Sequence, residues 1–329
     1  MSAVNIIVGD CRALLAAMEP QSVHCCVTSP PYFGLRDYGV DDQIGLEDRP
    51  DNFVAELVSV FREVRRVLRD DGTLWLNLGD SYATDSKWGG STGGKAAKKL
   101  HGLGGGGRYR TRSGLPDKNL IGIPWRVAFA LQADGWYLRQ DIIWHKPNPM
   151  PESVTDRCTK AHEYIFLLSK GPKYYFDNDA IKEQVADATV SRLSQRSLAS
   201  QVGSGRVPGK TNGNMKAVGG REKRNKRSVW TVTTKPFKGA HFATFPPDLI
   251  EPCILAGCPV GGTVLDPFGG AGTTGFVAKQ HGRNAILCEL NPEYAAMARE
   301  RIDTPPAARK SKKKPANDNR LADLFGAAA

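Results

Sequence analysis

Four consecutive residues near the amino end, Ser29-Pro30-Pro31-Tyr32, combine hydrogen-bond acceptors with a flat aromatic ring. Each proline fixes its φ angle at about −65° and donates no hydrogen bond, so the carbonyl groups of Ser29 and Pro30 can point outward as acceptors. The Ser29 hydroxyl adds another acceptor. Such a group could hold both hydrogens of an exocyclic amino group while Tyr32 stacks on the ring that carries it. Taken alone, the stretch is also typical of a turn that ends a strand.

A glycine-rich turn near the carboxyl end, at residues 266–275, is the second group that could bind a ligand. Gly270, Gly272 and Gly275 match the pattern G-x-G-x-x-G, and the acidic Glu289 ends the next predicted strand. This combination is typical of a site for an adenosine-containing cofactor, in which the acidic side chain accepts hydrogen bonds from ribose hydroxyls. By itself it does not separate NAD from S-adenosylmethionine.

Two further features favour S-adenosylmethionine. A dinucleotide-binding fold normally opens with its glycine turn, whereas this turn follows most of the predicted strands. Asp266, directly before the glycines, offers a carboxylate that attracts a cationic ammonium group and would repel a pyrophosphate. We therefore predict that S-adenosylmethionine is the cofactor.

Alternating helices and strands must position these two groups. Short β-branched runs predict strands, and apolar residues that recur with a period of about 3.6 residues predict helices. The predicted strands cover residues 4–8, 23–27, 73–78, 137–144, 164–168, 263–266 and 284–288, and the predicted helices cover residues 11–18, 52–68, 121–131 and 248–255. This order predicts a mostly parallel, doubly wound α/β sheet that binds ligands at the carboxyl ends of its strands. Pro252 within the last of these helices predicts a kink or a late start.

The net charge of +11 is unevenly distributed along the chain. Residues 87–118 carry 8 Lys and Arg against one acidic residue, residues 191–229 carry 10 against one, and residues 304–329 carry 6 against 2. The remainder of the chain is therefore acidic. Basic segments rich in glycine and serine on an acidic body are typical of an enzyme whose loops contact nucleic acid.

Cysteine spacing and hydropathy exclude other classes of protein. The 7 cysteines form no C-x-x-C pair, so neither a zinc site nor a disulfide framework is predicted, and no metal is expected. No apolar run approaches the roughly 18 residues that span a bilayer, and the first residues lack the features of a signal peptide. The predicted location is therefore cytoplasmic, without a membrane partner.

The order of the two groups resembles that in the β-group of exocyclic amino DNA methyltransferases, which are the cytosine-N4 and adenine-N6 enzymes. In that family the catalytic motif, here Ser29-Pro30-Pro31-Tyr32, precedes the cofactor motif, here residues 266–274. The similarity extends over residues 5–83, 120–180 and 228–302. It implies a Rossmann-like, S-adenosylmethionine-dependent methyltransferase fold with a permuted motif order and basic loop insertions.

The resemblance also implies the domain organisation. A single methyltransferase domain would cover residues 1–303, with a basic loop at residues 84–118 and a target-recognition insertion at residues 180–228. Residues 304–329 would form a basic, disordered tail. Double-stranded DNA is the expected substrate, and the expected enzyme is a bacterial or phage-encoded, nucleoid-associated member of a restriction-modification system.

Site residues follow from the same resemblance, which assigns catalysis to the Ser29-Pro30-Pro31-Tyr32 motif. Cofactor contacts are expected from Asp10, Phe245, Asp266, Pro267, Phe268, Gly270, Gly272, Thr273, Thr274, Glu289 and Asn291. Holding both hydrogens of the amino group would localise the nitrogen lone pair for direct attack on the sulfonium methyl group, without a covalent enzyme intermediate. The base must first rotate out of the duplex and stack on Tyr32.

The choice of target base depends on Ser29. Serine at the first motif position is commoner in the cytosine-N4 enzymes, and Asp or Asn is commoner in the adenine-N6 enzymes. We therefore predict cytosine-N4 methylation, with adenine-N6 methylation as the alternative. A C5-cytosine enzyme would need a Pro-Cys nucleophile, and Pro252-Cys253 lies within a predicted helix.

Two other classes are less favoured. A protein-glutamine methyltransferase would carry its glycine motif first, and a non-catalytic DNA-binding protein would leave the paired motifs without a role. The tail residues Leu321, Leu324 and Phe325 resemble part of a peptide that docks on sliding clamps. The oligomeric state stays open, with a homodimer among the alternatives.

Overall fold

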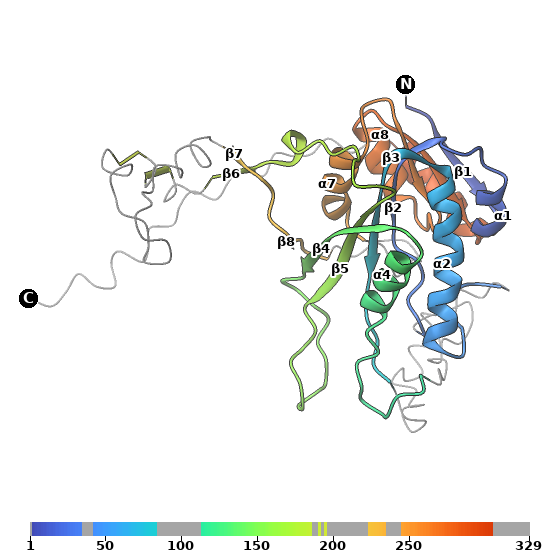
Figure 1. The fold of residues 1–329 in the computed structure, drawn as a ribbon, viewed down its shortest axis with the longest axis vertical. Helices are drawn as coiled ribbons and strands as arrows, with labels where there is room; N and C mark the ends of the chain where they lie inside the picture. Colours follow the sequence, from blue (N-terminus) through green and yellow to red (C-terminus); the bar gives the residue numbers. More distant parts are fainter. Residues whose placement is uncertain are drawn as a thin grey trace, which may run out of the picture.

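The computed structural model describes residues 2–34, 42–83, 113–185, 190–191, 194–195, 223–234 and 245–304. An eight-stranded sheet forms the centre of this part of the chain, with the strand order β1-β10-β9-β2-β3-β5-β4-β8 (Figure 1). Its strands are β1 (Val4–Val8), β2 (Val23–Thr28), β3 (Leu68–Leu78), β4 (Tyr137–His145), β5 (His162–Ser169), β8 (Val229–Thr231), β9 (Thr263–Asp266) and β10 (Asn284–Glu289). A separate two-stranded sheet pairs β6 (Glu183–Gln184) with β7 (Lys223–Arg224).

The sheet is mostly parallel, which confirms the predicted fold class. β1, β10, β9, β2 and β3 pair in parallel, β5 runs antiparallel to both β3 and β4, and β8 pairs in parallel with β4. The first strand pairs with the last one, and β9 lies beside β2. The strand that leads into Ser29 is therefore a direct neighbour of the strand that ends in Asp266.

Helices cover both faces of this sheet, so the fold is doubly wound (Figure 1). They are α1 (Cys11–Ala16), α2 (Pro50–Val67), α4 (Ile123–Ala133), α7 (Pro247–Gly257), α8 (Thr273–Gln280) and α9 (Pro292–Asp303), with a short 3-10 helix, η2 (Asp179–Ile181). One apolar cluster contains Phe53 and Leu57 of α2 together with Val127 of α4. The other contains Ile254 of α7 and Val277 of α8. The apolar residues of these helices are spaced to face the sheet, and their burial stabilises the layers.

The boundary between α2 and β3 differs from the prediction. We expected a helix over residues 52–68 and a strand over residues 73–78, but the helix ends at Val67 and the strand begins at Leu68. Leu68 pairs with Val23 of β2, and a register shift follows before the pairing resumes. The exposed, polar residues 69–71 lie in this irregular part, so the apolar pattern gave no strand signal there.

Of the kink or late start that Pro252 predicted for α7, the late start is wrong. The helix begins at Pro247 and contains Pro252. A proline inside a helix costs about 3 kcal/mol, mainly because it removes a hydrogen bond. The apolar side chains of Leu249, Cys253 and Ile254 are fully buried between α7 and the sheet, and this burial offsets the cost.

Several predicted features lie outside the described residues. Only residues 113–118 of the basic loop belong to the described part, and most of the insertion predicted at residues 180–228 does not. The tail beyond Thr304, with Leu321, Leu324 and Phe325, lies outside it as well. Within the described ranges, no helix is long and apolar enough to cross a membrane.

The carboxyl end of α7 approaches the sheet closely at Gly257. A methyl group on this residue would lie 2.6 Å from Trp75 Nε1, 2.7 Å from Cys25 Sγ and 2.8 Å from Thr73 Oγ1. These three side chains are buried, and Trp75 Nε1 donates a 3.2 Å hydrogen bond to Thr73 Oγ1. The approach of this helix to β2 and β3 therefore requires glycine.

We predict that Gly257→Ala lowers the free energy of unfolding by about 1–3 kcal/mol, because the added methyl group overpacks the helix-sheet contact. Urea denaturation measures the change. Gly171→Ala is the matched control, since a methyl group at Gly171 meets no atom within 4 Å. The control should change the free energy of unfolding by less than about 1 kcal/mol. Equal effects of the two substitutions would contradict the prediction.

Candidate active site

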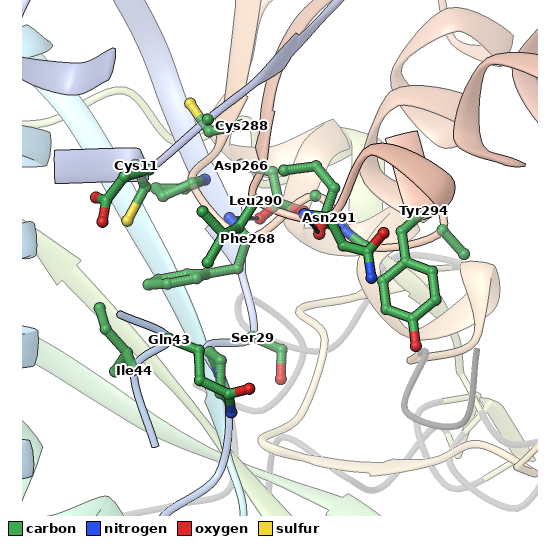
Figure 2. A pocket seen from close by; sticks show the side chains of 18 of the residues that line it. Cys11, Ser29, Gln43, Ile44, Asp266, Phe268, Cys288, Leu290, Asn291 and Tyr294 are labelled. Atoms are coloured by element: carbon green, nitrogen blue, oxygen red, sulfur yellow. Dashed lines mark hydrogen bonds between the residues drawn. The ribbon is translucent and has the colours of Figure 1, made fainter. Parts of the chain in front are cut away.

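A cavity of about 910 Å³, part of it open to solvent, lies at the carboxyl ends of β1, β10, β9 and β2 (Figure 2). Carboxyl ends of parallel strands are where open α/β sheets bind ligands. Its walls combine two distant parts of the sequence, the residues after β2 and the glycine turn after β9. The lining residues are Gly9, Asp10, Cys11, Ser29, Pro31, Asp42, Gln43, Ile44, Phe245, Asp266, Pro267, Phe268, Gly269, Gly270, Ala271, Thr273, Cys288, Glu289, Leu290, Asn291 and Tyr294.

Asp266 organises the start of the glycine turn. Its side chain is buried, and one carboxylate oxygen accepts hydrogen bonds from Thr28 Oγ1 at 2.6 Å and from the Phe268 backbone N–H at 3.1 Å. The other oxygen accepts from Thr274 Oγ1 at 2.6 Å. Burial raises the pKa of Asp266, and these neutral donors only partly oppose the rise. The carboxylate therefore ties β2, β9 and α8 together at the edge of the cavity.

Glu289 closes the other side of the turn. Its two carboxylate oxygens accept hydrogen bonds from the Gly270 N–H at 2.7 Å and from the Asn291 N–H at 2.8 Å. Burial raises the pKa of this carboxyl group as well. The end of β10 is thereby locked to the glycine turn, and the rest of the carboxylate faces the cavity that Glu289 lines.

Gly272 and Thr274 support the turn without lining the cavity. Gly272 adopts a left-handed φ of 75° where α8 begins, and a methyl group there would lie 2.8 Å from Ala298 Cβ. Glycine is thus required for both the backbone conformation and the approach of α9. Thr274 is fully buried and donates to Asp266. These two predicted cofactor residues therefore lie behind the surface that a cofactor would touch.

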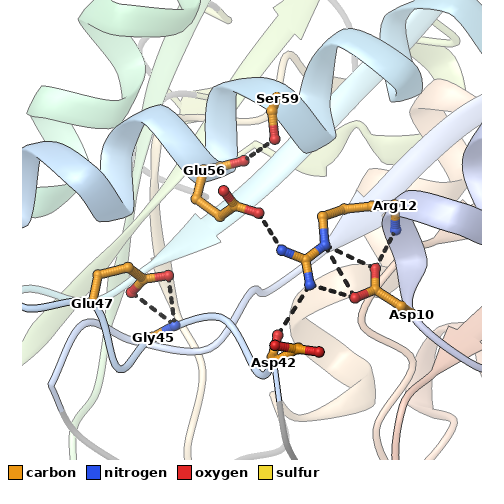
Figure 3. Close-up of polar contacts among 7 residues, drawn as sticks. All are labelled: Asp10, Arg12, Asp42, Gly45, Glu47, Glu56 and Ser59. Carbon is orange, nitrogen blue, oxygen red and sulfur yellow. Dashed lines mark hydrogen bonds and ion pairs between the residues drawn. The ribbon is translucent and has the colours of Figure 1, made fainter.

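Asp10 forms the opposite wall and is held by Arg12, a residue outside the lining that the sequence patterns did not single out (Figure 3). The Asp10 side chain caps α1 by accepting from the Arg12 N–H at 2.7 Å. The Arg12 guanidinium donates to both Asp10 carboxylate oxygens, and this bonding lowers the pKa of Asp10. Arg12 also pairs with Glu56 of α2 and donates to the Asp42 carbonyl at 3.1 Å.

The segment that contains Asp42, Gln43 and Ile44 forms a further wall of the cavity. It is held by Arg12 at Asp42 and by the following Gly45, whose carbonyl accepts from the Gly34 N–H at 2.8 Å. No motif marks this segment, because its position depends on a contact with an arginine 30 residues earlier in the sequence.

The predicted catalytic motif lies directly after β2. Ser29 is half-buried and lines the cavity with Pro31, while Pro30 is buried behind them. Tyr32 does not line the cavity, and its hydroxyl donates a 2.7 Å hydrogen bond to Glu163 Oε2. Ser29 and Pro31 therefore line the cavity, whereas Pro30 and Tyr32 do not.

The structure brings together most of the predicted site residues. Those that line the cavity are Ser29, Pro31, Asp10, Phe245, Asp266, Pro267, Phe268, Gly270, Thr273, Glu289 and Asn291. Those that do not are Pro30, Tyr32, Gly272 and Thr274. The lining residues that the sequence patterns missed are Gly9, Cys11, Asp42, Gln43, Ile44, Gly269, Ala271, Cys288, Leu290 and Tyr294. Most of these adjoin a predicted residue in sequence, so a wider window around each motif would have included them.

The charge of the cavity fits a cationic ligand. The described residues that line it include four carboxylate side chains, those of Asp10, Asp42, Asp266 and Glu289, and no lysine, arginine or histidine. S-adenosylmethionine carries a sulfonium and an ammonium group, which such a lining attracts, whereas a pyrophosphate would be repelled. The Phe268 ring offers an apolar surface for an adenine ring (Figure 2).

The cysteine alternative fails on geometry. Cys253, which follows Pro252, is fully buried in α7, and burial raises the pKa of its thiol. It does not line the cavity. A buried, protonated thiol cannot attack a base, so the structure excludes this residue as a nucleophile. Among the described residues, no group of His, Cys, Asp or Glu could hold a metal ion.

Comparisons with known proteins agree with this geometry. A family model described as DNA methylase matches residues 23–300. The Type II methyltransferase M.SmaI of Serratia marcescens is 48% identical over 298 residues, which cover 91% of this chain and 90% of that protein. The Type II methyltransferase M.Cfr9I of Citrobacter freundii is 47% identical over 302 residues, with 92% and 88% coverage.

Solved structures share the fold. The cytosine-N4-specific PvuII DNA methyltransferase superimposes with a TM-score of 0.60 at 18% identity, over 93% of this chain and 89% of that one. A protein of Thermus thermophilus, solved in complex with S-adenosyl-L-methionine, superimposes with a TM-score of 0.55 at 26% identity, over 91% of this chain and 93% of that one.

We predict that Arg12→Ala weakens S-adenosylmethionine binding about 3-fold to 10-fold, because the wall at Asp42 loses the hydrogen bond that holds it. Isothermal titration calorimetry measures the dissociation constant. The matched control is Arg62→Ala, which removes an arginine that also pairs with a carboxylate, Asp134, but one that does not line the cavity. The control should bind the cofactor as the wild type does. Equal affinity of Arg12→Ala and the wild type would contradict the role of Arg12.

The raised pKa of Asp266 predicts a pH-dependent contribution to stability. The unfolded chain releases this proton near the usual 3.8, whereas the folded chain keeps it to higher pH, so the free energy of unfolding falls as the pH rises between these two values. Asp266→Asn lacks this contribution. The stability advantage of the wild type over Asp266→Asn should therefore shrink as the pH rises above 4, by at most about 1.4 kcal/mol per pH unit.

Urea denaturation of the wild type and Asp266→Asn from pH 4 to pH 7 measures how this difference in the free energy of unfolding changes with pH. The same change at Asp303, whose side chain is 77% exposed, is the matched control for removing one carboxylate. An advantage of the wild type that grows with pH would contradict the prediction.

Proposed function

This chain belongs to the DNA methylase family of cytosine-N4 and adenine-N6 methyltransferases, and we propose that within this family it methylates the N4 amino group of cytosine in double-stranded DNA. The protein is an S-adenosylmethionine-dependent DNA methyltransferase. What remains to be assigned is the base, the residues that act on it and the part of the chain that selects the sequence.

The observation that carries the cytosine proposal is Ser29 at the first position of the motif, on the wall of the cofactor cavity. Its hydroxyl and the carbonyl groups of Ser29 and Pro30 would accept the two hydrogens of the amino group. These contacts would localise the nitrogen lone pair and aim it at the cavity. The serine is neutral, as is typical of the cytosine-N4 enzymes that the motif resembles.

S-adenosylmethionine supplies an electrophilic methyl group on its sulfonium. We propose that Asp10, Asp266 and Glu289 provide the negative field that favours this cation, and that Phe268 and Phe245 enclose its apolar parts. Asp10 is well suited to this task because its bonds to Arg12 keep its carboxyl ionised. Asp266 and Glu289 also hold the glycine turn in shape.

DNA recognition is proposed to lie in the basic segments at residues 84–118 and 180–228. Their positive charge suits the phosphate backbone, and the folded body that carries them is acidic. The target base would leave the duplex to reach Ser29, because the amino group of a paired base cannot meet the methyl donor. The curated relatives are Type II methyltransferases, which supports a sequence-specific role in restriction-modification.

We predict that DNA incubated with the purified protein and S-adenosylmethionine acquires N4-methylcytosine. Mass spectrometry of the nucleosides after complete digestion measures this product. The control is Ser29→Ala, which removes the hydroxyl acceptor and should slow methyl transfer about 10-fold to 100-fold, in line with the loss of roughly one to three kcal/mol of transition-state stabilisation. N6-methyladenine without N4-methylcytosine would overturn the cytosine assignment and establish the adenine alternative.

A further inference from the structure

A partly buried polar cluster lies beside the catalytic motif and outside the cofactor cavity. It consists of Tyr32, Asn77 of β3, Lys146 directly after β4 and Glu163 of β5. None of these residues lines the cofactor cavity. Three neighbouring strands, β3, β5 and β4, bring them together at the edge of the sheet that carries the motif.

Glu163 is the centre of this cluster. Its carboxylate forms an ion pair with Lys146, and the side chains are only 14% and 18% exposed, respectively. The other carboxylate oxygen, Oε2, accepts a 2.7 Å hydrogen bond from the Tyr32 hydroxyl. Asn77 Nδ2 lies 3.4 Å from the same oxygen and donates to the Tyr164 carbonyl at 3.0 Å.

Burying a charged pair is costly unless both groups are fully hydrogen-bonded. The Lys146 ammonium donates to Glu163 and also lies 4.3 Å from the centre of the Trp144 ring. Glu163 accepts from both Lys146 and Tyr32. The carboxylate is therefore held from one side by a fixed cation and presents its second oxygen to the tyrosine.

Tyr32 is restrained at both ends of its ring. The hydroxyl is bonded to Glu163, and the ring edge lies against the backbone at Gly79, directly after β3, where a methyl group would come within 2.5 Å of Tyr32 Cε2. A tyrosine side chain has two rotatable bonds, so a bond at its tip and contact at its edge define the plane of the ring. The plane of this ring determines where a stacked base would lie.

We propose that Glu163 is a positioning residue for the target base: it fixes the Tyr32 ring in the plane that stacks the flipped base and brings its amino group to Ser29. Lys146 holds Glu163 in turn. The inference rests on the proposed function only in that Tyr32 must meet the flipped base, and it applies to cytosine and adenine equally. Residues on or next to β4 and β5 would then affect the methylation rate, although these strands form no wall of the cofactor cavity.

The test compares two variants that differ in whether residue 163 can accept the hydrogen bond of the Tyr32 hydroxyl. Both variants carry Lys146→Met. One combines it with Glu163→Gln and the other with Glu163→Leu, so each loses the ion pair without leaving a buried charge. Glutamine can still accept from the Tyr32 hydroxyl, and leucine cannot. Each pair of substitutions is also made together with Tyr32→Phe, which lacks the hydroxyl.

The measurement is the single-turnover rate of methyl transfer from tritium-labelled S-adenosylmethionine to unmodified bacterial genomic DNA, at saturating cofactor. We expect the glutamine variant to react about 10-fold faster than the leucine variant when Tyr32 is present, and less than about 2-fold faster with Tyr32→Phe. The dissociation constant of S-adenosylmethionine should be the same in all four proteins. If Glu163 had a purely structural role, the difference in rate between the glutamine and leucine variants would not depend on Tyr32.

The inference would be overturned if the glutamine and leucine variants reacted at equal rates. It would also be overturned if the difference in rate stayed the same with Tyr32→Phe. If the variants with Lys146→Met do not fold, the cycle of Tyr32→Phe, Glu163→Leu and their combination makes the same decision, because leucine removes the acceptor and coupled residues give non-additive losses. The tritium assay counts methyl groups on either base, and nucleoside mass spectrometry identifies the base. Failure of the cytosine proposal is thus distinguishable from failure of this one.

Discussion

A buried hydrogen bond between Thr28 and Asp266 joins the two halves of the active site across 238 residues of sequence. It is possible because β2 and β9 are neighbours in the sheet, and it is strong because a buried carboxylate must find donors. Ser29 follows Thr28, and the glycine turn follows Asp266. The bond therefore sets Ser29 and the glycine turn against one cavity, and the proposed methyl transfer depends on that alignment.

The carboxylates around the cavity combine structural and electrostatic roles. Asp266 and Glu289 are held by backbone and hydroxyl donors that also shape the glycine turn, while Asp10 is held by Arg12. The same groups give the cavity a negative field that suits a sulfonium. Tyr32 is held by Glu163 of β5, so the two ends of the Ser29-Pro30-Pro31-Tyr32 motif contact different parts of the sheet.

Local patterns predicted the elements well because the helices and strands of this fold bury continuous apolar faces. The period of α2 and the β-branched run of β1 each identified an element correctly. Errors arose where packing overrode local preference. Leu68 pairs with β2 although polar residues follow it, and α7 contains Pro252 because its apolar face is buried. The segment at Asp42 was missed because its place depends on Arg12, a contact with no signature in sequence.

The sequence by itself determined the glycine-rich motif, the Ser29-Pro30-Pro31-Tyr32 motif and their order, because each is a run of adjacent residues that can be recognised without knowing its surroundings. It also indicated which segments are basic. Only the tertiary structure decided which predicted residues face the cavity and which, like Gly272 and Thr274, lie behind it. The same holds for the partners of Asp10 and Tyr32, since a hydrogen bond between strands or helices depends on sheet order and register, which arise from the packing of the whole chain.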